Sequence, residues 1–337
     1  MQFGTDQIVQ SDQTTIMILR LITLLLLLIP ATAIAQTPNP AAPDSASIYR
    51  AVGDSLRMAG DLPGAAGSLH KAYLATPSEK RGGEDGIGYT LASTLALIGN
   101  QNDHSFMVLE EILPSLTSMK VLHDPDMYFL VEDERWASVK GRLLDRLAGE
   151  VSGSFDRVLA AELLVIRRNE WVGRYHIMLL FRQSGGRSPA LTLLSHGMGE
   201  RHVQNEVDLI SILDEKGWPK ISSVGEEAAY AATNVLTHMG LHARQIYLPM
   251  LEAACEDEEA DWGEYAPSLD RTELELGRSQ VYGTQMEIDE ELGEYVPRPL
   301  LDPGNVDERR AAIGMEPIAD QLARFNAAMA RDFGESR

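Results

Sequence analysis

The sequence predicts a mainly α-helical protein, with a module of short helical repeats followed by a helical domain that contains one small β-hairpin. Three observations predict this class. Apolar residues recur at the three- and four-residue spacing of amphipathic helices, and small residues recur at fixed positions between residues 46 and 145. Polar and apolar residues alternate only near residues 280–297. With 44% hydrophobic residues among 337, the chain can bury a core in each half.

Residues 1–35 are expected to form a secretory signal peptide. Arg20 precedes a nearly continuous apolar run, residues 21–29, and Ala33 and Ala35 have the spacing of a cleavage signature. The run is too short to cross a bilayer stably, so we expect no stable membrane span once it is removed. Residues 1–16 contain no Lys or Arg, and the true start is therefore expected at Met17. An uncleaved anchor is the alternative. Residues 36–45, which are rich in Pro and Ala, are expected to be a linker.

The charge of the chain limits its partners. The formal net charge is −21, whereas nucleic-acid binding needs clustered Lys and Arg, so we expect no nucleic-acid partner.

The single cysteine, Cys255, cannot form an internal disulfide, and the acidic residues that follow it would raise the pKa of its thiol. Cys255 is therefore interpreted as a packed helix residue. A periplasmic or secreted location follows from the expected signal peptide.

Residues 46–79 have the length of one helical repeat and its distribution of side-chain sizes. Small residues would let two antiparallel helices approach closely, larger ones would fill the gaps, and a proline would end the second helix. The residues that match are Tyr49, Val52, Gly53, Leu56, Gly60, Ala65, Leu69, Ala72 and Pro77. On these residues the segment resembles a tetratricopeptide repeat.

A second, degenerate repeat is expected between residues 91 and 116, where His104 stands in place of the usual Ala. Residues 124–140 are expected to be an acidic cap, and the side chains predicted to pack on the repeat are Phe129, Leu130, Trp136 and Val139. Two repeats and a cap are fewer than a free-standing solenoid needs, so this module, residues 46–145, is expected to pack against the second domain for stability. It would bind a protein or peptide on its concave face, or it would serve as a spacer.

The second domain is expected at residues 155–335. Its predicted helices cover about residues 159–174, 202–216, 224–239, 241–257 and 264–277, followed by one starting near Val306 and one from Pro317 to about residue 332. Residues 183–200 are expected to be irregular or inserted, and residues 280–297 to form a hairpin around the Leu292-Gly293 turn.

The second domain also resembles the bacterial domain-of-unknown-function family numbered 6624. The residues that carry the resemblance are 217–229, His238, Gln245, 247–249, Asp270, Arg271, 280–285 and 299–317. The resemblance covers about residues 157–324 and implies no activity. The chain departs from the family where Asn169-Glu170 and Arg174 replace the usual Asp-Gln and Arg, and in the apparent insertion near residues 183–200.

Several polar residues of this domain lie in apolar contexts and are candidates for a site. The possible catalytic residues are His238, as a general base or polar anchor, with Tyr282, Gln285 and Arg309. The candidate ligand-binding residues are Trp218, Asp270, Arg271, Gln280 and Thr284. For each, the alternative is a structural role: a buried histidine, a core tryptophan, an ion pair or a network that braces the hairpin. His242 follows His238 at a spacing that could hold a metal on one helix, but Gly240 would break that helix, and no metal or cofactor is expected.

Two functional hypotheses follow. The favoured one is an exported binding or scaffold protein of the cell envelope, which holds a partner through the repeat module. The alternative is a hydrolase with a polar site around His238, Tyr282, Gln285 and Arg309. The second hypothesis requires these four side chains to meet in one pocket.

Overall fold

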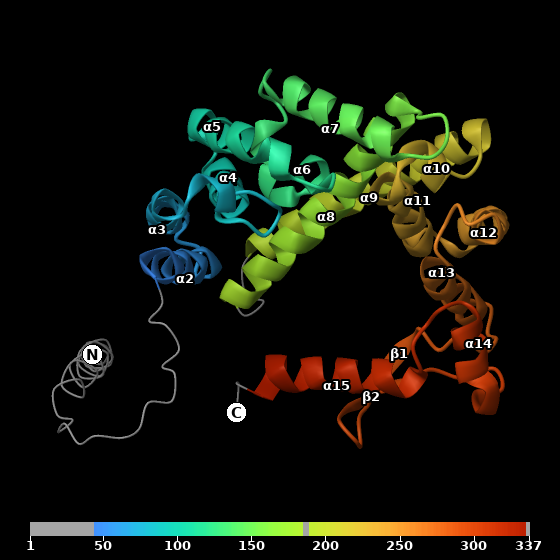
Figure 1. Ribbon diagram of the computed structural model, residues 1–337. Helices are drawn as coiled ribbons and strands as arrows, with labels where there is room; N and C mark the ends of the chain where they lie inside the picture. The colour runs from blue at the N-terminus through green and yellow to red at the C-terminus, as the bar shows by residue number, and fades with distance from the viewer. Residues whose placement is uncertain (1–43, 185–188, 335–337) are drawn as a thin grey trace, which may run out of the picture. The chain divides into compact units, whose positions relative to one another are not determined.

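The computed structural model describes residues 44–184 and 189–334 (Figure 1). The chain divides into two units, Met1–Asp44 and Ser45–Arg337, and every described helix and strand belongs to the second unit. The expected signal peptide lies outside the described residues, as does nearly all of the linker. The second unit is mainly helical. Among the described residues, β-structure is limited to one two-stranded antiparallel hairpin and an isolated bridge, which confirms the predicted fold class.

The first helical pair has the close approach that its small residues predict. It consists of α2 (Ser45–Met58) and α3 (Leu62–Ala75). Asp61 caps the start of α3 by accepting a hydrogen bond from the backbone N–H of Gly64. A Cβ atom at Gly53 would stand 2.6 Å from Cγ of Leu69, so only glycine fits at this crossing. Tyr49, expected to fill a gap, is instead partly exposed and lies beside Lys71.

The second pair and the cap complete the module. The elements are η1 (Ser78–Lys80), α4 (Ile87–Ile98), α5 (Asn102–Ile112), η2 (Leu113–Ser115), α6 (Lys120–His123), η3 (Pro125–Leu130) and α7 (Trp136–Glu150). Leu130, Trp136 and Val139 are buried as predicted, but Phe129 is half exposed, so its predicted packing is wrong. Phe129 follows Tyr128 in a short 3-10 helix, whose buried side holds Met127 and Leu130.

Two long helices, α8 (Arg157–Ser184) and α9 (Pro189–Lys216), pack against each other next in the chain. The irregular segment expected at residues 183–200 is therefore wrong from residue 189 onward, because the backbone is helical there. Pro189 occupies the first position of α9, where its missing N–H costs no helical hydrogen bond. Gly197 and Gly199 have low intrinsic helix propensity, yet both lie within α9.

The helices after α9 follow the predicted boundaries closely. They are α10 (Ile221–Val224), α11 (Glu226–His238), α12 (Leu241–Glu256) and α13 (Trp262–Glu275). Gly240 separates α11 from α12 as predicted, so His238 and His242 do not share a helix. Asp261 caps α13 by accepting from the backbone N–H of Gly263.

The C-terminal part contains the predicted hairpin. Its strands are β1 (Met286–Asp289) and β2 (Glu294–Pro297), followed by η4 (Pro303–Asn305), α14 (Val306–Ala312) and α15 (Ile318–Gly334). Met286 pairs with Pro297, and Asp289 with Glu294. The hairpin is shorter than predicted, because residues 280–285 precede the strands as a loop. An isolated β-bridge between Gln280 and Leu300 and further backbone hydrogen bonds join this loop to the return segment. Helix α15 packs along β2.

One apolar core runs through both predicted domains. It includes buried side chains from Ala65 in α3 to Tyr265 in α13. Helix α8 lies at its centre, because it packs against α6, α7 and η3 of the module and against α9, α10 and α11 of the second domain. The module therefore shares its core with the second domain. None of the described helices combines the length and apolar character needed to cross a membrane.

Candidate functional site

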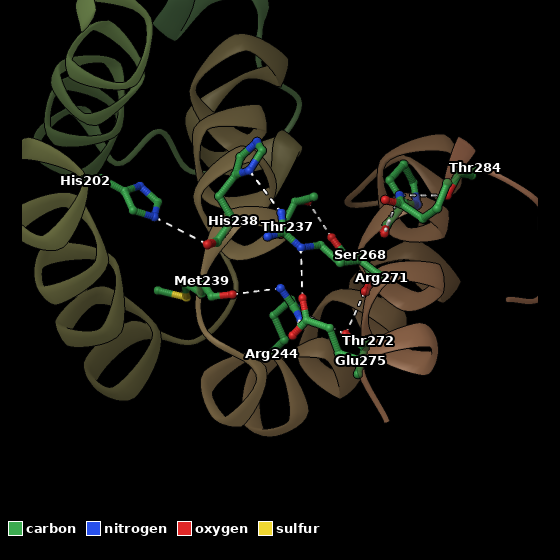
Figure 2. A network of polar contacts seen from close by, with 12 residues as sticks. His202, Thr237, His238, Met239, Arg244, Ser268, Arg271, Thr272, Glu275 and Thr284 are labelled. Carbon is green, nitrogen blue, oxygen red and sulfur yellow. Dashed lines mark hydrogen bonds and ion pairs between the residues drawn. The ribbon is translucent and has the colours of Figure 1, made fainter. Parts of the chain in front are cut away.

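The structure places the residues predicted from the sequence, apart from Trp218, in two groups, and each group contacts α13. One group surrounds the loop at residues 280–285. The other lies where α11 meets α9 and α13, and Figure 2 shows it together with the neighbouring polar contacts. The contacts of each group decide what its side chains can do.

Asp270, on α13, holds the loop through its carboxylate. The side chain is fully buried. It accepts hydrogen bonds from the backbone N–H groups of Val281, Tyr282 and Thr284 at 2.7, 2.9 and 2.8 Å, and from the hydroxyl of Thr284 at 2.8 Å. Gly283 permits this loop, because its φ is 72° and a Cβ atom there would stand 2.5 Å from Cδ1 of Ile318. Asp270 therefore acts as the anchor of the loop.

Gln280 is also fully buried, and its amide is satisfied by the backbone. Its Nε2 donates to the carbonyl oxygens of Gln285 and Arg298 at 3.0 and 2.7 Å, and its Oε1 accepts from the N–H of Gln285 at 2.9 Å. The Gln285 side chain donates to the carbonyl of Pro267 at 3.4 Å. Both amides join the loop to its surroundings, which favours the bracing interpretation over ligand binding.

Two arginines of α14 hold the same loop from the other side. Arg309 donates from Nε to the carbonyl of Val281 at 2.9 Å, and from Nη2 to the carbonyls of Leu301 and Asp302. The buried Arg310 donates to the carbonyl of Tyr282 at 2.7 Å. Burial, and then the charge of Asp270, raise the pKa of the Tyr282 phenol, so that side chain stays neutral.

His238 belongs to the second group. It ends α11, and its Nδ1 lies 3.3 Å from Nη1 of Arg271 (Figure 2). Arg271 also donates to the carbonyl of Thr237 at 3.3 Å and forms an ion pair with Glu275 at 3.2 Å. Because a guanidinium can only donate, Nδ1 of His238 is the acceptor, which places the ring proton on Nε2. The structure thus brings together two predicted residues, His238 and Arg271.

Sequence reasoning missed the neighbours of this pair on α8 and α9. Nδ1 of His202 lies 3.1 Å from the buried carboxylate of Glu170, and Nδ2 of Asn205 donates to the same oxygen at 2.7 Å. The rings of His202 and His238 meet edge to face with centroids 6.4 Å apart. Nε2 of His202 lies 3.1 Å from Glu206. The signal available in the sequence was the pair His202 and Asn205, three residues apart on one helix face.

This histidine cluster, defined as Glu170, His202, Asn205, His238 and Arg271, has the chemistry of proton exchange. A buried carboxylate fixes one imidazole, and a second imidazole stands beside it in a defined tautomer. Such a pair can orient a polar group or pass a proton. In the described part of the chain, no group of three or more His, Cys, Asp and Glu side chains is placed to hold a metal ion.

Trp218, the remaining candidate, is a core residue. It is buried in the shared core, and no partner satisfies its indole N–H. This burial favours the core interpretation of Trp218 over a surface that stacks on a ligand. Cys255 is also buried, as predicted, and the pKa of its thiol is raised to about 12. The main cause is burial, followed by the charges of Asp261 and Glu252, and not the acidic residues that directly follow Cys255.

A cavity of about 430 Å³ lies between the N-terminal helices α2, α4 and α6, the 3-10 helix η3 and α8. Sequence reasoning placed a site on the concave face of the module but did not identify the residues, because half of them follow the repeats or belong to α8. The lining residues are Arg50, Arg57, Glu84, Asp85, Tyr89, Thr90, Ser93, Lys120, His123, Asp124, Pro125, Asp126, Arg167 and Trp171.

Charged pairs shape the module side of the cavity. Arg57 forms a close ion pair with Asp126, and the hydroxyl of Tyr89 donates to Asp124 at 2.7 Å. The ammonium of Lys120 lies 4.7 Å from the centre of the Tyr89 ring. Burial is the main cause that raises the pKa of Asp126 to about 6, although Arg57 opposes it. One carboxylate oxygen of Asp126 has no hydrogen-bond partner.

Helix α8 supplies the opposite wall. Arg167 donates to the carbonyl of Glu227 at 2.6 Å, and its guanidinium stacks 4.8 Å from the ring centre of Tyr230. Burial lowers the pKa of Arg167, and the negative charge of Glu227 partly offsets this effect. Trp171 is 41% exposed, which is unusual for a tryptophan and leaves much of the indole open to a ligand.

Comparison with known proteins gives one match. The model of a family described as "Family of unknown function (DUF6624)" matches residues 159–331. No curated protein and no solved structure matches the chain. The matched region begins in α8 and includes the histidine cluster and the braced loop, whereas the repeat module precedes it.

We predict that Asp270→Asn destabilises the braced loop. The amide would place an N–H₂ group against backbone donors, and a buried donor without an acceptor costs about 1–3 kcal/mol. The free energy of unfolding in urea should fall by about 3 kcal/mol, and the amides of residues 281–284 should lose protection from hydrogen exchange. Glu290→Gln, at the exposed hairpin turn, serves as the control. Unchanged protection in Asp270→Asn would show that the carboxylate does not anchor the loop.

We predict that Asp126 makes stability depend on pH. Because folding raises its pKa from 3.8 to about 6, its protonated form stabilises the fold below pH 3.8, and this contribution is lost as the pH rises through about 6. The difference corresponds to about 3 kcal/mol. Relative to Asp126→Asn, which does not titrate, the free energy of unfolding of the wild type should therefore fall between pH 4 and pH 7. The exposed Asp85→Asn should show no such trend, and a constant difference across this range would contradict the assignment.

Proposed function

Since this chain belongs to DUF6624, a family of unknown function, we propose its role from its own geometry: an exported binding protein of the cell envelope. Its ligand would occupy the cavity between the repeat module and α8. The ligand class that we propose is a peptide or an exposed protein segment that carries charges of both signs.

The observation that carries this proposal is the cavity itself. Its volume of about 430 Å³ lies within the range of small-ligand sites. The lining alternates cations, such as Arg57 and Lys120, with carboxylates, such as Asp85 and Asp124, and Trp171 offers an aromatic face. A peptide segment supplies the amides, charges and apolar stems that such a lining can pair with.

The contacts of the braced loop favour binding over hydrolysis. The hydrolase hypothesis needed Gln285 and Arg309 to act with His238, but both bond to backbone carbonyls around the loop. His238 is paired instead with Arg271. The histidine cluster is the support that the hydrolase hypothesis retains, and His238 is the one residue that it shares with the site first proposed.

Location can be tested independently of the ligand. We expect the full-length chain, expressed in a Gram-negative host, to appear in the periplasm or the medium. Because Ala33 and Ala35 form the expected cleavage signature, N-terminal sequencing of the exported protein should begin at Gln36. Accumulation in the cytoplasm with an intact N-terminus would contradict the export proposal and would leave the cavity proposal untouched.

Point substitutions are the appropriate test of the cavity, since deletion of the module would open the shared core. The full chain and Trp171→Ala would be immobilised and exposed to envelope extract, and captured chains would be identified by mass spectrometry. Loss of the indole should weaken capture of the specific partner about tenfold, which corresponds to about 1.4 kcal/mol. Phe129→Ala removes an aromatic ring that is somewhat more exposed and lies outside the cavity, and this variant should bind normally. Equal capture by all three proteins would exclude the cavity as the binding site.

A further inference from the structure

A second surface lies on the side of α8 nearly opposite the cavity. At 3.6 residues per turn, Arg167 and Trp171 point to one side of the helix, whereas Glu162, Val165 and Ile166 point to the other. The second side forms a groove with α9 of about 480 Å³. Its lining residues are Glu162, Val165, Ile166, Asp208, Ser211, Ile212, Glu215 and Lys216. We call this surface the α8–α9 groove.

The floor of the α8–α9 groove is apolar. Ile166 and Ile212 are buried at its base, and Val165 is partly exposed above them. On α9, Val203 and Val207 are exposed at positions four residues apart, and Ser211 continues the same stripe into the groove. On α8, Val158 is also exposed and lies two helical turns before Val165 on the same side of the helix. A soluble protein seldom exposes several valines on two neighbouring helices without a partner.

The rim of the groove carries one sign of charge. Glu162, Asp208 and Glu215 are carboxylates, and Lys216 is the cation among the lining residues. The ammonium of Lys216 is directed to Asp156 at 3.5 Å, so it does not neutralise the rim. The net charge of −21 adds a long-range field of the same sign. An apolar floor between carboxylates is complementary to a ligand with an apolar stripe flanked by cations.

We propose that the α8–α9 groove binds a cationic amphipathic helix of a partner protein. The apolar face of that helix would rest on Ile166, Ile212 and Val165, and its Lys or Arg side chains would reach Glu162, Asp208 and Glu215. Helix-in-groove recognition uses apolar anchors at spacings of three and four residues, which the two-helix groove matches. A membrane surface does not fit, because anionic lipids would be repelled by the rim. This surface is independent of the cavity proposed above.

The test uses the full exported chain and a fluorescent probe peptide of about 18 residues, with Leu on one helical face and Lys on the flanks. A scrambled peptide of the same composition has no apolar face. Anisotropy titrations should show at least tenfold tighter binding of the amphipathic peptide than of the scrambled one. Equal affinity for the two peptides would mean that charge alone drives association, and would overturn the proposal.

Matched variants locate the binding. Glu162→Gln, Asp208→Asn and Glu215→Gln together remove three rim charges, and should weaken the probe at least tenfold and reduce the salt dependence of its affinity. The control combines Glu256→Gln, Asp257→Asn and Glu258→Gln, which remove the same charge from an exposed segment at the C-terminal end of α12 and should bind as the wild type does. Val165→Ser should weaken binding without altering the salt dependence. An equal loss in both triple variants would exclude the groove.

Discussion

Helix α8 has to bury side chains against two sets of helices at once, and the rest of the structure depends on this constraint. Its buried residues include Leu159, Ala160, Leu163, Leu164, Ile166 and Val172, and its partners come from the module on one side and from α9 and α11 on the other. The N-terminal helices share their buried core with α8, which contacts α6, η3 and α7, so this part of the chain does not form a separate core. The family match begins in this same helix, at residue 159. The first helix of the family region thus also closes the module that precedes it.

The C-terminal part of the chain is held by a different physical principle. After Ala266, Val306 is the one apolar side chain that is buried among the described residues, so little hydrophobic burial stabilises this part. Hydrogen bonds replace it: Asp270, Gln280 and Arg310 are fully buried and bond mostly to backbone groups of the loop and its return segment. Buried polar groups are costly unless satisfied, and here they are satisfied by a fixed backbone geometry. This is why polar residues in apolar contexts, which looked like a site in the sequence, serve as braces.

Features set by interactions between residues close in sequence could be predicted, whereas features set by contacts between distant residues could not. Helix ends such as Gly240 and the hairpin turn at Gly293 are set by local backbone chemistry, so they could be predicted. The first turns of α9 could not, because Gly197 and Gly199 lower the intrinsic helix propensity of this segment although its backbone is helical. The histidine cluster depends on Glu170 and His202, which lie 32 residues apart and meet only after the two long helices pair. His238 and Arg271 were identified as candidates, but no sequence spacing could indicate that they face each other.

Both surfaces proposed to bind ligands use α8. The interactions at each surface can be tested separately, although both depend on the stability of the same helix. The cavity uses Arg167 and Trp171 on one side of the helix and pairs charges of both signs, whereas the groove uses Glu162 and Val165 on the nearly opposite side and carries one sign. Added salt should therefore affect the groove more than the cavity, since a one-signed rim depends on unscreened attraction. A substitution in the buried row between them, at Leu163 or Leu164, would weaken both surfaces together by loosening the helix. Rim substitutions act on one surface each, so the two roles of α8 can be examined independently in the intact protein.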